Sequence, residues 1–440
     1  MQLNKKNSLI FFYIFLLLHL IVWVLIPSIT NINLPLDTIE ALAWGSDLEW
    51  GYNKHPPLSA FFVEVFYKVF GPQDWAYYFL SQIFVIFSFF IVFKLGEKIF
   101  GDSLLSFLSV ILLEGIFFYN FTTPEFNVNI CQLPFWSLVV YYSFKIYEKR
   151  EINLIDSILL GLFGALGFLS KYLFIYLLIS IVLLFTFLLF IKRDRKFDFK
   201  YLISIEVFLV LLVPHFVWLF NNDFISISYG IARTDLIENN PINHIKYPFI
   251  FLLKQFGILI PCLGLSFLVI NRLKLDLNFR DNKFIFLLFI NFVPIFLMFF
   301  TSMILGAKIR TMWMTPFYLF FGTLIIFIFK NYIKLSETKN FLYGFIIIFS
   351  LSPISYAAVS LIKDDKRTDF PGKKISKKIQ KSWDEEFNEP INIVLGDEWL
   401  AGNLSYHLRS RPVWGGPVNQ KKLDSYSKYV CINEICVGNK

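Results

Sequence analysis

Apolar stretches of about 17–22 residues follow one another along most of the chain, and short polar loops separate them. Each stretch is long enough to cross a bilayer core as a helix. The first stretch has a basic start but no small-x-small cleavage site after it, so we expect an uncleaved anchor rather than a signal peptide. The pattern predicts about eleven membrane-spanning helices, at residues 9–26, 75–93, 104–119, 128–146, 154–169, 173–191, 201–219, 247–270, 284–303, 312–329 and 341–362.

The composition agrees with an all-α polytopic membrane protein. Of 440 residues, 56% are hydrophobic and 17% are charged, whereas about a quarter of a soluble domain is charged. Lys and Arg gather in alternate loops, which places the N-terminus in the cytoplasm and the C-terminus on the outer side. These loops also explain the net charge of +8, so we expect no nucleic-acid partner.

The sequence changes character after the last apolar stretch. Residues 363–440 are polar and include two short β-like runs, at 391–396 and 429–437. We therefore divide the chain into a membrane domain, residues 1–362, and a small α/β appendage, residues 363–440, on the outer side.

The four cysteines fall into two groups. Cys131 and Cys262 lie in apolar stretches and are typical of inert core residues. Cys431 and Cys436 would face each other across a tight hairpin, where a disulfide can form in an oxidising compartment. The alternative is a pair of free thiols.

The segment between the first two apolar stretches, residues 27–74, is too long for a plain connector. It predicts two helices, at residues 38–50 and 58–70, separated by Pro56 and Pro57. Both are amphipathic and rich in aromatic residues, which is typical of helices that lie along the membrane interface. Charged residues at a membrane surface usually serve a purpose, so we expect the chemistry of the protein in this loop.

Asp37 and Glu40 are the candidate catalytic residues of this loop. They lie three positions apart and therefore on one face of the predicted helix. The alternative is an N-cap followed by a first-turn acid, which is an ordinary helix start. Lys54 and His55 precede the two prolines, where a rigid turn would hold a cation in place; the alternative is an exposed turn.

Further polar residues recur on the same outer side, in loops that are far apart in the sequence. Each one alone could be a side chain that reaches the interface, but together they combine several cations with carboxylates. Such a set suits a substrate with an anionic phosphate and a lipid tail, because cations hold the phosphate and a carboxylate accepts a proton from a hydroxyl. The candidates for substrate binding are Lys54, His55, Glu125, Asn127, Lys171, Tyr172, His215, Asn222, Arg233, Lys308 and Arg310.

Short motifs follow one another along the membrane domain: Asp37-x-x-Glu40, Trp44, Gly51-Tyr-x-Lys-His-Pro-Pro-Leu58, Glu125-Phe-Asn-Val-Asn129, Leu169-Ser-Lys-Tyr172, Pro214-His-Phe-Val-Trp218, Asn221-Asn-Asp-Phe224 and Arg310-Thr-x-Trp313-x-x-Pro316. In this order they resemble bacterial glycosyltransferase family 39. These proteins are similar to lipid A aminoarabinose transferases, galacturonosyltransferases of lipopolysaccharide and protein O-mannosyltransferases.

The resemblance implies a GT-C fold and a sugar donor carried on polyprenyl phosphate. It also implies that Asp37 is the acid at the reaction centre. Family members often have Asp-Glu there, whereas Thr38 follows Asp37 in this chain, so the role of Glu40 stays open. His55 stands where some relatives have a Lys before Pro-Pro, so the resemblance assigns contact with the donor phosphate to His55, Lys54 or both. Glu125 and Asn127 occupy the second loop, where relatives often place an acid or a His near the reaction centre, and Lys171, Lys308 and Arg310 match basic positions that would face the lipid phosphate.

The residues and the resemblance together predict a glycosyltransferase of the bacterial inner membrane. It would move a sugar from a polyprenyl-phosphate donor to a periplasmic-side acceptor such as lipid A, lipopolysaccharide or protein. The sequence has no glycine-rich nucleotide loop, which argues against a nucleotide-sugar donor. No cofactor is certain; Asp37 and Glu125 offer paired oxygens that a divalent metal ion could use.

Two other functions stay open. The first is a secondary transporter or flippase, although such proteins place polar residues near the bilayer midplane, between related halves. Here the polar residues crowd one edge and no repeat of halves is visible. The second is another GT-C activity, such as oligosaccharide ligation or polymerisation.

Overall fold

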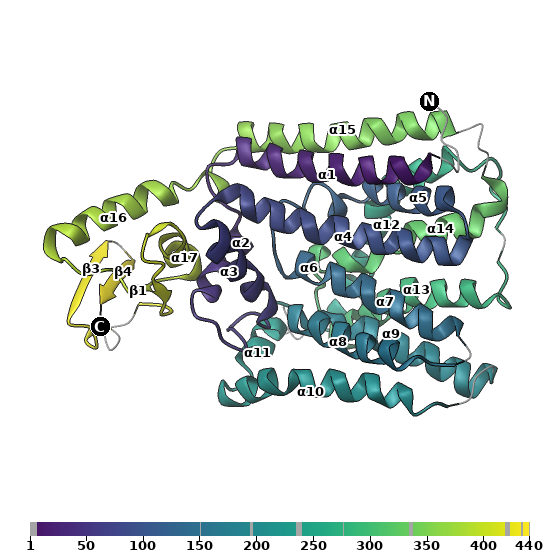
Figure 1. Ribbon diagram of the computed structural model, residues 1–440, viewed down its shortest axis with the longest axis horizontal. Coiled ribbons are helices and arrows are strands. Elements are labelled where there is room, and N and C mark those ends of the chain that lie inside the picture. The colour runs from purple at the N-terminus through teal and green to yellow at the C-terminus, as the bar shows by residue number, and fades with distance from the viewer. Residues whose placement is uncertain are drawn as a thin grey trace.

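The structure, a computed structural model, describes residues 7–149, 151–193, 197–234, 240–275, 277–333, 338–418, 423–432 and 434–439. Most of its helices run side by side in one bundle (Figure 1). The longer helices of this bundle are α1 (Ser8–Thr30), α4 (Asp74–Phe100), α5 (Ser103–Ile111), α7 (Leu133–Glu148), α8 (Leu154–Ser170), α9 (Ile175–Thr186), α10 (Lys200–Asn221), α12 (Asn243–Phe267), α13 (Asn282–Leu305), α14 (Phe321–Phe329) and α15 (Thr338–Ile362).

Further helical segments connect these helices or extend them. Two of them belong to the loop after α1, namely α2 (Leu36–Gly45) and α3 (Leu58–Phe70). The others are η1 (Leu112–Gly115), η2 (Phe117–Tyr119), α6 (Val128–Cys131), η3 (Tyr172–Phe174), the π-helical η4 (Phe187–Lys192), α11 (Ile225–Ala232), η5 (Thr311–Tyr318) and η6 (Lys330–Tyr332).

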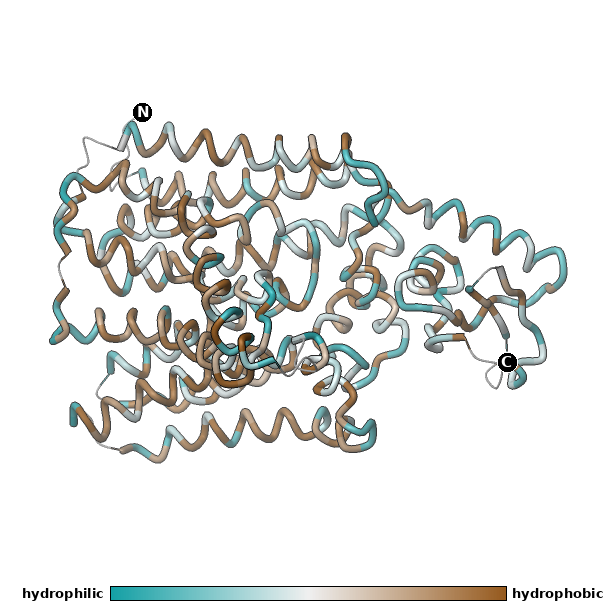
Figure 2. The backbone as a smooth tube through the Cα atoms, turned by 180° about the vertical axis from the view of Figure 1, so that it is seen from behind, coloured by the Kyte–Doolittle hydropathy of each residue, from teal (hydrophilic) through white to brown (hydrophobic). Residues whose placement is uncertain are grey.

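Among the described residues, 7 helices are long and apolar enough to cross a membrane, or up to 8 if the bent pair Thr311–Tyr318 and Phe321–Tyr332 is one span. Ser103–Gly115 and Leu154–Ser170 are apolar but shorter. Figure 2 shows hydrophobic residues along the middle of the bundle and hydrophilic residues at its ends and in the C-terminal part. The predicted all-α polytopic membrane fold is confirmed.

The predicted span 104–119 differs most from the structure. The α-helix ends at Ile111, and the chain continues as η1 and η2. Glu114 of η1 is buried, and its Oε1 lies 2.7 Å from Nδ1 of the equally buried His19 in α1. Asn120 donates a hydrogen bond to the Glu114 carbonyl at 2.7 Å. Buried polar groups need such partners, and these contacts occur where the regular helix stops.

The chain after α15 forms a small α/β tail. It contains η8 (Arg367–Asp369), α16 (Gly372–Glu386), α17 (Glu398–His407) and a 4-stranded sheet in the order β2-β1-β4-β3. The strands are β1 (Ile393–Leu395), β2 (Val413–Trp414), β3 (Lys428–Ile432) and β4 (Ile435–Asn439). β1 pairs with β2 in parallel, and β4 lies antiparallel between β1 and β3. The tail buries its own cluster, with Trp383, Val394 and Leu404 at its centre.

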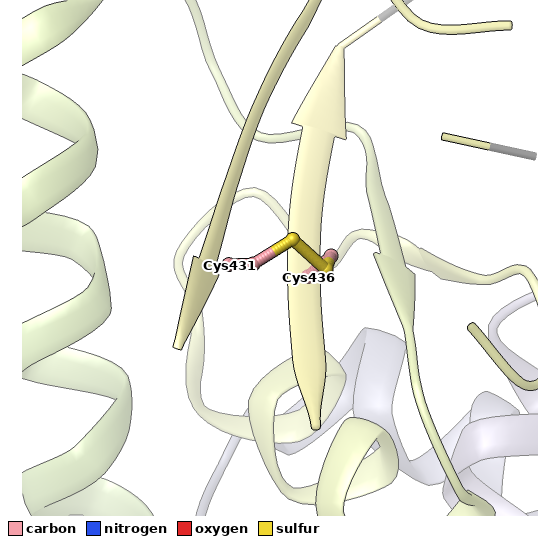
Figure 3. The surroundings of a disulfide bond; sticks show 2 residues. All are labelled: Cys431 and Cys436. Atoms are coloured by element: carbon pink, nitrogen blue, oxygen red, sulfur yellow. A yellow bond between two sulfur atoms is a disulfide. The ribbon is translucent and has the colours of Figure 1, made fainter. Parts of the chain in front are cut away.

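A disulfide closes the β3–β4 hairpin. Cys431 and Cys436 lie opposite each other in the antiparallel register and are bonded (Figure 3). Cys131 and Cys262 are free and buried, as their apolar surroundings predict. The disulfide that the spacing allowed is therefore present.

The tail packs against α2, and α3 lies beside α2 at the same end of the bundle (Figure 1). Both predicted helices of the first loop are present, but α2 is shorter than predicted and α17 covers one of its faces. A Cβ added to Gly402 of α17 would lie 3.0 Å from the Ala43 side chain and from the Ile39 carbonyl. Glycine therefore allows α17 to approach α2 closely enough to bring the tail beside the loop after α1.

Candidate functional site

A cavity of about 530 Å³ opens at the α2 end of the bundle. Its walls come from α2, the turn before α3, the α8–α9 junction, α11, α13 and the start of η5. Apolar side chains such as Met298, Leu305 and Phe168 line one part of it. The candidate residues that line it are Asp37, Glu40, Lys54, His55, Lys171, Tyr172 and Arg233.

Asp37 lies in the first turn of α2, which Pro35 starts in an extended conformation. The dipole of a helix favours a carboxylate at this position. The backbone amide of Asp37 donates to Glu125 Oε1 at 3.0 Å, and the Thr38 hydroxyl donates to the Phe126 carbonyl at 3.0 Å. These two bonds join α2 to the loop before α6 and fix the position of Asp37 at the cavity.

Burial raises the pKa of both carboxyl groups of this pair. The pKa of Glu125 rises to about 8, because burial and the nearby Asp37 charge both disfavour its ionised form. Burial also raises the pKa of Asp37, although Lys171, Lys54 and Arg233 oppose the rise. The two acids therefore disfavour each other's ionised form, and Asp37 is the one of the pair that lines the cavity.

Lys54 stands between two carboxylates. A hydrogen bond from the Tyr52 amide to the His55 carbonyl, at 3.1 Å, closes the turn that carries it. Its ammonium lies 3.0 Å from Glu40 Oε1 and also pairs with Glu398 of α17. Burial raises the pKa of Glu40 to about 7 against the opposing effect of Lys54. Glu40, the second acid of the predicted pair, is therefore an ion-pair partner of Lys54.

Lys171 is the most buried cation of the cavity, with 5% of its surface exposed. It follows the last residue of α8, donates to the Asn129 side-chain oxygen, and has its ammonium 5.5 Å from the centre of the Trp313 ring. Burial lowers the pKa of Lys171 to about 7, partly offset by Asp37. An anion that enters the cavity would favour the charged form of this lysine.

The ring of Tyr229 lies near two cations of the cavity, Lys54 and Arg233. Its centre lies 5.9 Å from the Lys54 ammonium and 5.7 Å from the Arg233 guanidinium. The His55 ring meets it edge-on, with 6.1 Å between centres. Burial and the neighbouring cations lower the pKa of His55 to about 3. His55 is therefore neutral and can exchange hydrogen bonds with a ligand, but it does not add the positive charge that its sequence position suggested.

A second polar group supports the wall beside Tyr172. The Tyr172 hydroxyl lies 2.6 Å from the Ser226 hydroxyl and 3.1 Å from His215 Nε2. His215 is buried behind Tyr172 and does not line the cavity. A Cβ on Gly51 would overlap the ring of Trp218, so this glycine lets the loop after α1 lie directly on α10.

The other candidates lie outside the cavity lining. Glu125 contacts Asp37 from behind, and Asn127 caps α6 by accepting hydrogen bonds from the Asn129 and Ile130 amides. Asn222 is exposed at the end of α10 and bonds to the Trp218 carbonyl. Lys308 is exposed, and Arg310 approaches the Arg233 carbonyl at 3.5 Å. The positive charges near Asp37 are instead Lys171, Lys54 and Arg233.

Sequence reasoning gave no role to Glu398, Asn129, Tyr229 or Trp313, although all of them contact a cavity cation. Asn129 and Trp313 lie within the quoted motifs, so the motifs held part of the signal. Glu398 follows Asp397, which caps α17 by accepting from the Leu400 amide at 2.7 Å. In the sequence this pair looks like any acidic helix start, so only the fold shows its partner.

The described residues contain no group of three or more His, Cys, Asp or Glu side chains arranged to hold a metal ion. Asp37 and Glu125 lie together, but Glu125 Oε1 accepts from the Asp37 amide and the pair holds a proton near neutral pH. Two carboxyl groups, one of them already accepting from a backbone amide, supply fewer oxygens than the ligand set that a divalent ion prefers.

Residues 54–218 match the dolichyl-phosphate-mannose-protein mannosyltransferase family. No curated protein matches the whole sequence closely enough to count as a relative. The fold is similar to the crystal structure of ArnT from Cupriavidus metallidurans bound to undecaprenyl phosphate, with TM-score 0.66, 12% identity, and coverage of 96% of this chain and 88% of that chain. The apo ArnT structure gives TM-score 0.63, 11% identity, and coverage of 94% and 86%. The resemblance to glycosyltransferase family 39 and its GT-C fold is confirmed.

Proposed function

We propose that this GT-C membrane protein is a glycosyltransferase that takes a sugar from a polyprenyl-phosphate donor. One observation carries the proposal: a half-buried carboxyl group, that of Asp37, lines a cavity together with Lys54, Lys171 and Arg233. Three cations suit a phosphate that develops charge when the sugar leaves. The apolar part of the same cavity suits the first isoprenoid units of the carrier.

In the proposed reaction, the acceptor hydroxyl attacks the anomeric carbon of the sugar. A new bond forms between the acceptor oxygen and that carbon, and the bond between the carbon and the phosphate oxygen breaks. The hydroxyl proton passes to Asp37, and polyprenyl phosphate leaves as an anion held by Lys54, Lys171 and Arg233. Glu125 keeps its own proton and thereby limits repulsion at Asp37.

The ArnT structure bound to undecaprenyl phosphate supports a carrier of this class, since the two folds correspond over most of both chains. We also propose the bacterial inner membrane as the location, with the cavity on the periplasmic side. Lysines at the bundle end opposite the cavity, among them Lys94, Lys98 and Lys145, favour that end as the cytoplasmic one. Lipid A, lipopolysaccharide and protein are the acceptors to test first.

The experiment is sugar transfer by the purified protein in nanodiscs, with radiolabelled undecaprenyl-phosphate sugars and envelope extracts as acceptors. We expect the Asp37→Asn variant to transfer about 10²- to 10⁴-fold more slowly, the range for a lost general base, while still binding undecaprenyl phosphate. Asp47→Asn, at an exposed position of the same loop, is the matched control. Wild-type rates from Asp37→Asn would remove Asp37 from the mechanism, and no transfer with any extract would count against the function itself.

A further inference from the structure

Lys254 is a charged residue near the middle of α12, a helix apolar enough to cross the membrane. It is exposed, and it lies among large exposed apolar side chains of the same helix, Leu253 (55% exposed), Phe256 (66%) and Ile260 (66%). That surface is the one that lipid would cover in a bilayer. A cation at such a place is unfavourable unless it has a partner, so it is a candidate site by default.

The ammonium group of Lys254 has a groove beside it. The groove has a volume of about 320 Å³ and is lined by Gly115, Phe117, Gly257, Pro261, Thr311 and Lys254. Gly115 lies so close to α12 that an added Cβ would be 2.6 Å from the Cys262 amide nitrogen. Gly115 therefore lets η1 lie directly against α12, whereas a Cβ on Gly257 would meet nothing within 4 Å, so this glycine leaves the groove open.

The described part of the chain provides no carboxylate partner for Lys254. Lys94, another cation of the bundle, does have one, since it pairs with Glu97 at 2.8 Å. Lys246, nearer the start of α12, lies beside the Tyr247 ring at 5.9 Å. Thr311 is the other residue of the groove lining with a polar side chain. The groove therefore combines the cation of Lys254, the hydroxyl of Thr311 and apolar walls. This combination suits a ligand that has an anionic group attached to hydrocarbon chains.

The groove and the main cavity lie on opposite sides of the same short segment. Thr311 lines the groove, whereas Met312 and Trp313 line the cavity that contains Asp37. No residue lines both spaces. A ligand of the groove would therefore be distinct from the donor and would touch the segment that supports the Trp313 ring beside Lys171.

We propose that this groove binds the phosphate headgroup of an anionic bilayer phospholipid. The Lys254 ammonium pairs with the phosphate, the Thr311 hydroxyl donates a second hydrogen bond, and the acyl chains lie along Leu253, Phe256 and Ile260. A phospholipid fits better than free phosphate, because the groove opens on the apolar face of α12 and offers only one charge.

The test is native mass spectrometry of the full-length protein released from nanodiscs that contain phosphatidylglycerol and phosphatidylcholine in equal amounts. We expect the wild type to retain phosphatidylglycerol preferentially. Lys254→Met should lower that retention about tenfold, the effect of one lost charge-assisted contact. Lys254→Arg should keep it, because the charge remains. Lys246→Met, which removes an exposed cation of the same helix away from the groove, should retain as much lipid as the wild type.

Two further arms separate the possible outcomes. Added inorganic phosphate should not displace the lipid, and displacement would show a site for free anions instead. Equal retention by wild type and Lys254→Met would overturn the proposal and leave Lys254 as a side chain that reaches the interface. Methionine suits a lipid-facing position, so the variant should fold; Lys254→Gln against Lys254→Arg gives the same comparison if it does not. None of these readouts depends on sugar transfer.

Discussion

Glu398 of the C-terminal tail pairs with the ammonium of Lys54 in the loop after α1. The same carboxylate accepts a hydrogen bond from the Asn53 side chain at 2.6 Å. Lys54 also contacts Glu40, so its charge is shared between an acid of the membrane domain and an acid of the tail. A phosphate that binds Lys54 has to compete with both.

The first prediction concerns this competition. Glu398→Gln removes one negative charge beside Lys54 while keeping a hydrogen-bond acceptor, so the cavity becomes more positive. We expect undecaprenyl phosphate to bind about three- to tenfold more tightly, a range set by the partial burial of the pair. A binding titration in detergent measures this. Glu389→Gln, which breaks the 2.6 Å Lys428–Glu389 pair elsewhere in the tail, should leave the affinity unchanged. Equal affinities for wild type and Glu398→Gln would show that Lys54 does not meet the phosphate.

The second prediction concerns pH. Because burial lowers the pKa of Lys171 to about 7, this side chain is charged below pH 7 and becomes neutral as the pH rises above it. Affinity for undecaprenyl phosphate should therefore fall between pH 7 and pH 9, a window in which the phosphate, with a second pKa of about 6, gains little further charge. Deprotonation of Glu125, whose pKa is about 8, acts in the same direction.

Lys171→Arg separates these two contributions, since arginine stays charged throughout this window. The variant should show a shallower fall in affinity with pH than the wild type, and the difference between the curves belongs to Lys171. Identical slopes for the two proteins would mean that Lys171 is not the group that titrates.

The third prediction concerns how the tail is held. Arg411 donates to Glu64 and to the Leu42 carbonyl, both at 2.7 Å, and its guanidinium lies 4.2 Å from the centre of the Tyr67 ring. Arg411→Ala would leave Glu64 unpaired, so the free energy of opening the tail should fall by about 3–5 kcal/mol. Hydrogen exchange in α17 measures this opening.

Two comparisons make that experiment specific. Arg409→Ala, at an exposed position of the same tail, should leave the exchange of α17 unchanged. Combining Arg411→Ala with Glu64→Gln should recover part of the loss, because the uncompensated charge is then absent. Protection of α17 in Arg411→Ala equal to that of the wild type would exclude Arg411 as a tether.

The fourth prediction concerns the cysteines. The Cys431–Cys436 disulfide leaves Cys131 and Cys262 as the free thiols among the 4 cysteines. Denatured protein should therefore bind two equivalents of an alkylating reagent without reductant and four after reduction, as mass spectrometry can count. Four equivalents without reductant would show that the hairpin is not oxidised in the isolated protein.

Hydrophobic patterning predicted much of the fold, because each apolar stretch needs only its own length and composition to become a membrane helix. It failed at residues 104–119, where buried Glu114 accepts through its carbonyl from Asn120, just beyond this range, in a contact that an unbroken helix would not allow. A hydropathy pattern registers two polar residues there but not the partner, His19, that lies in another helix.

The sequence predicted some residues of the candidate site correctly and missed others. Asp37 and Glu40 share the cavity because helical spacing places them on one face. Lys308 and Arg310 lie outside it although they belong to the same side of the membrane. Topology gives the depth of a residue in the membrane but not its lateral position, so it could not separate these two residues from Lys171 and Arg233. The role of Glu398 could not be predicted from the sequence. It lies 345 residues after Asn53, and no periodicity of the sequence relates positions so far apart.

That separation has a consequence for biosynthesis. The ribosome delivers the turn with Lys54 among the first segments and α17 among the last, so every helix of the bundle is inserted before Glu398 is available. In the nascent protein Lys54 therefore lacks its second carboxylate partner until the tail has reached the end of the bundle where α2 lies. A chain that stalls or is cleaved after α15 would keep all of its membrane helices and the cations of the cavity. In such a chain, Glu40 would be the remaining one of the two acids that pair with Lys54.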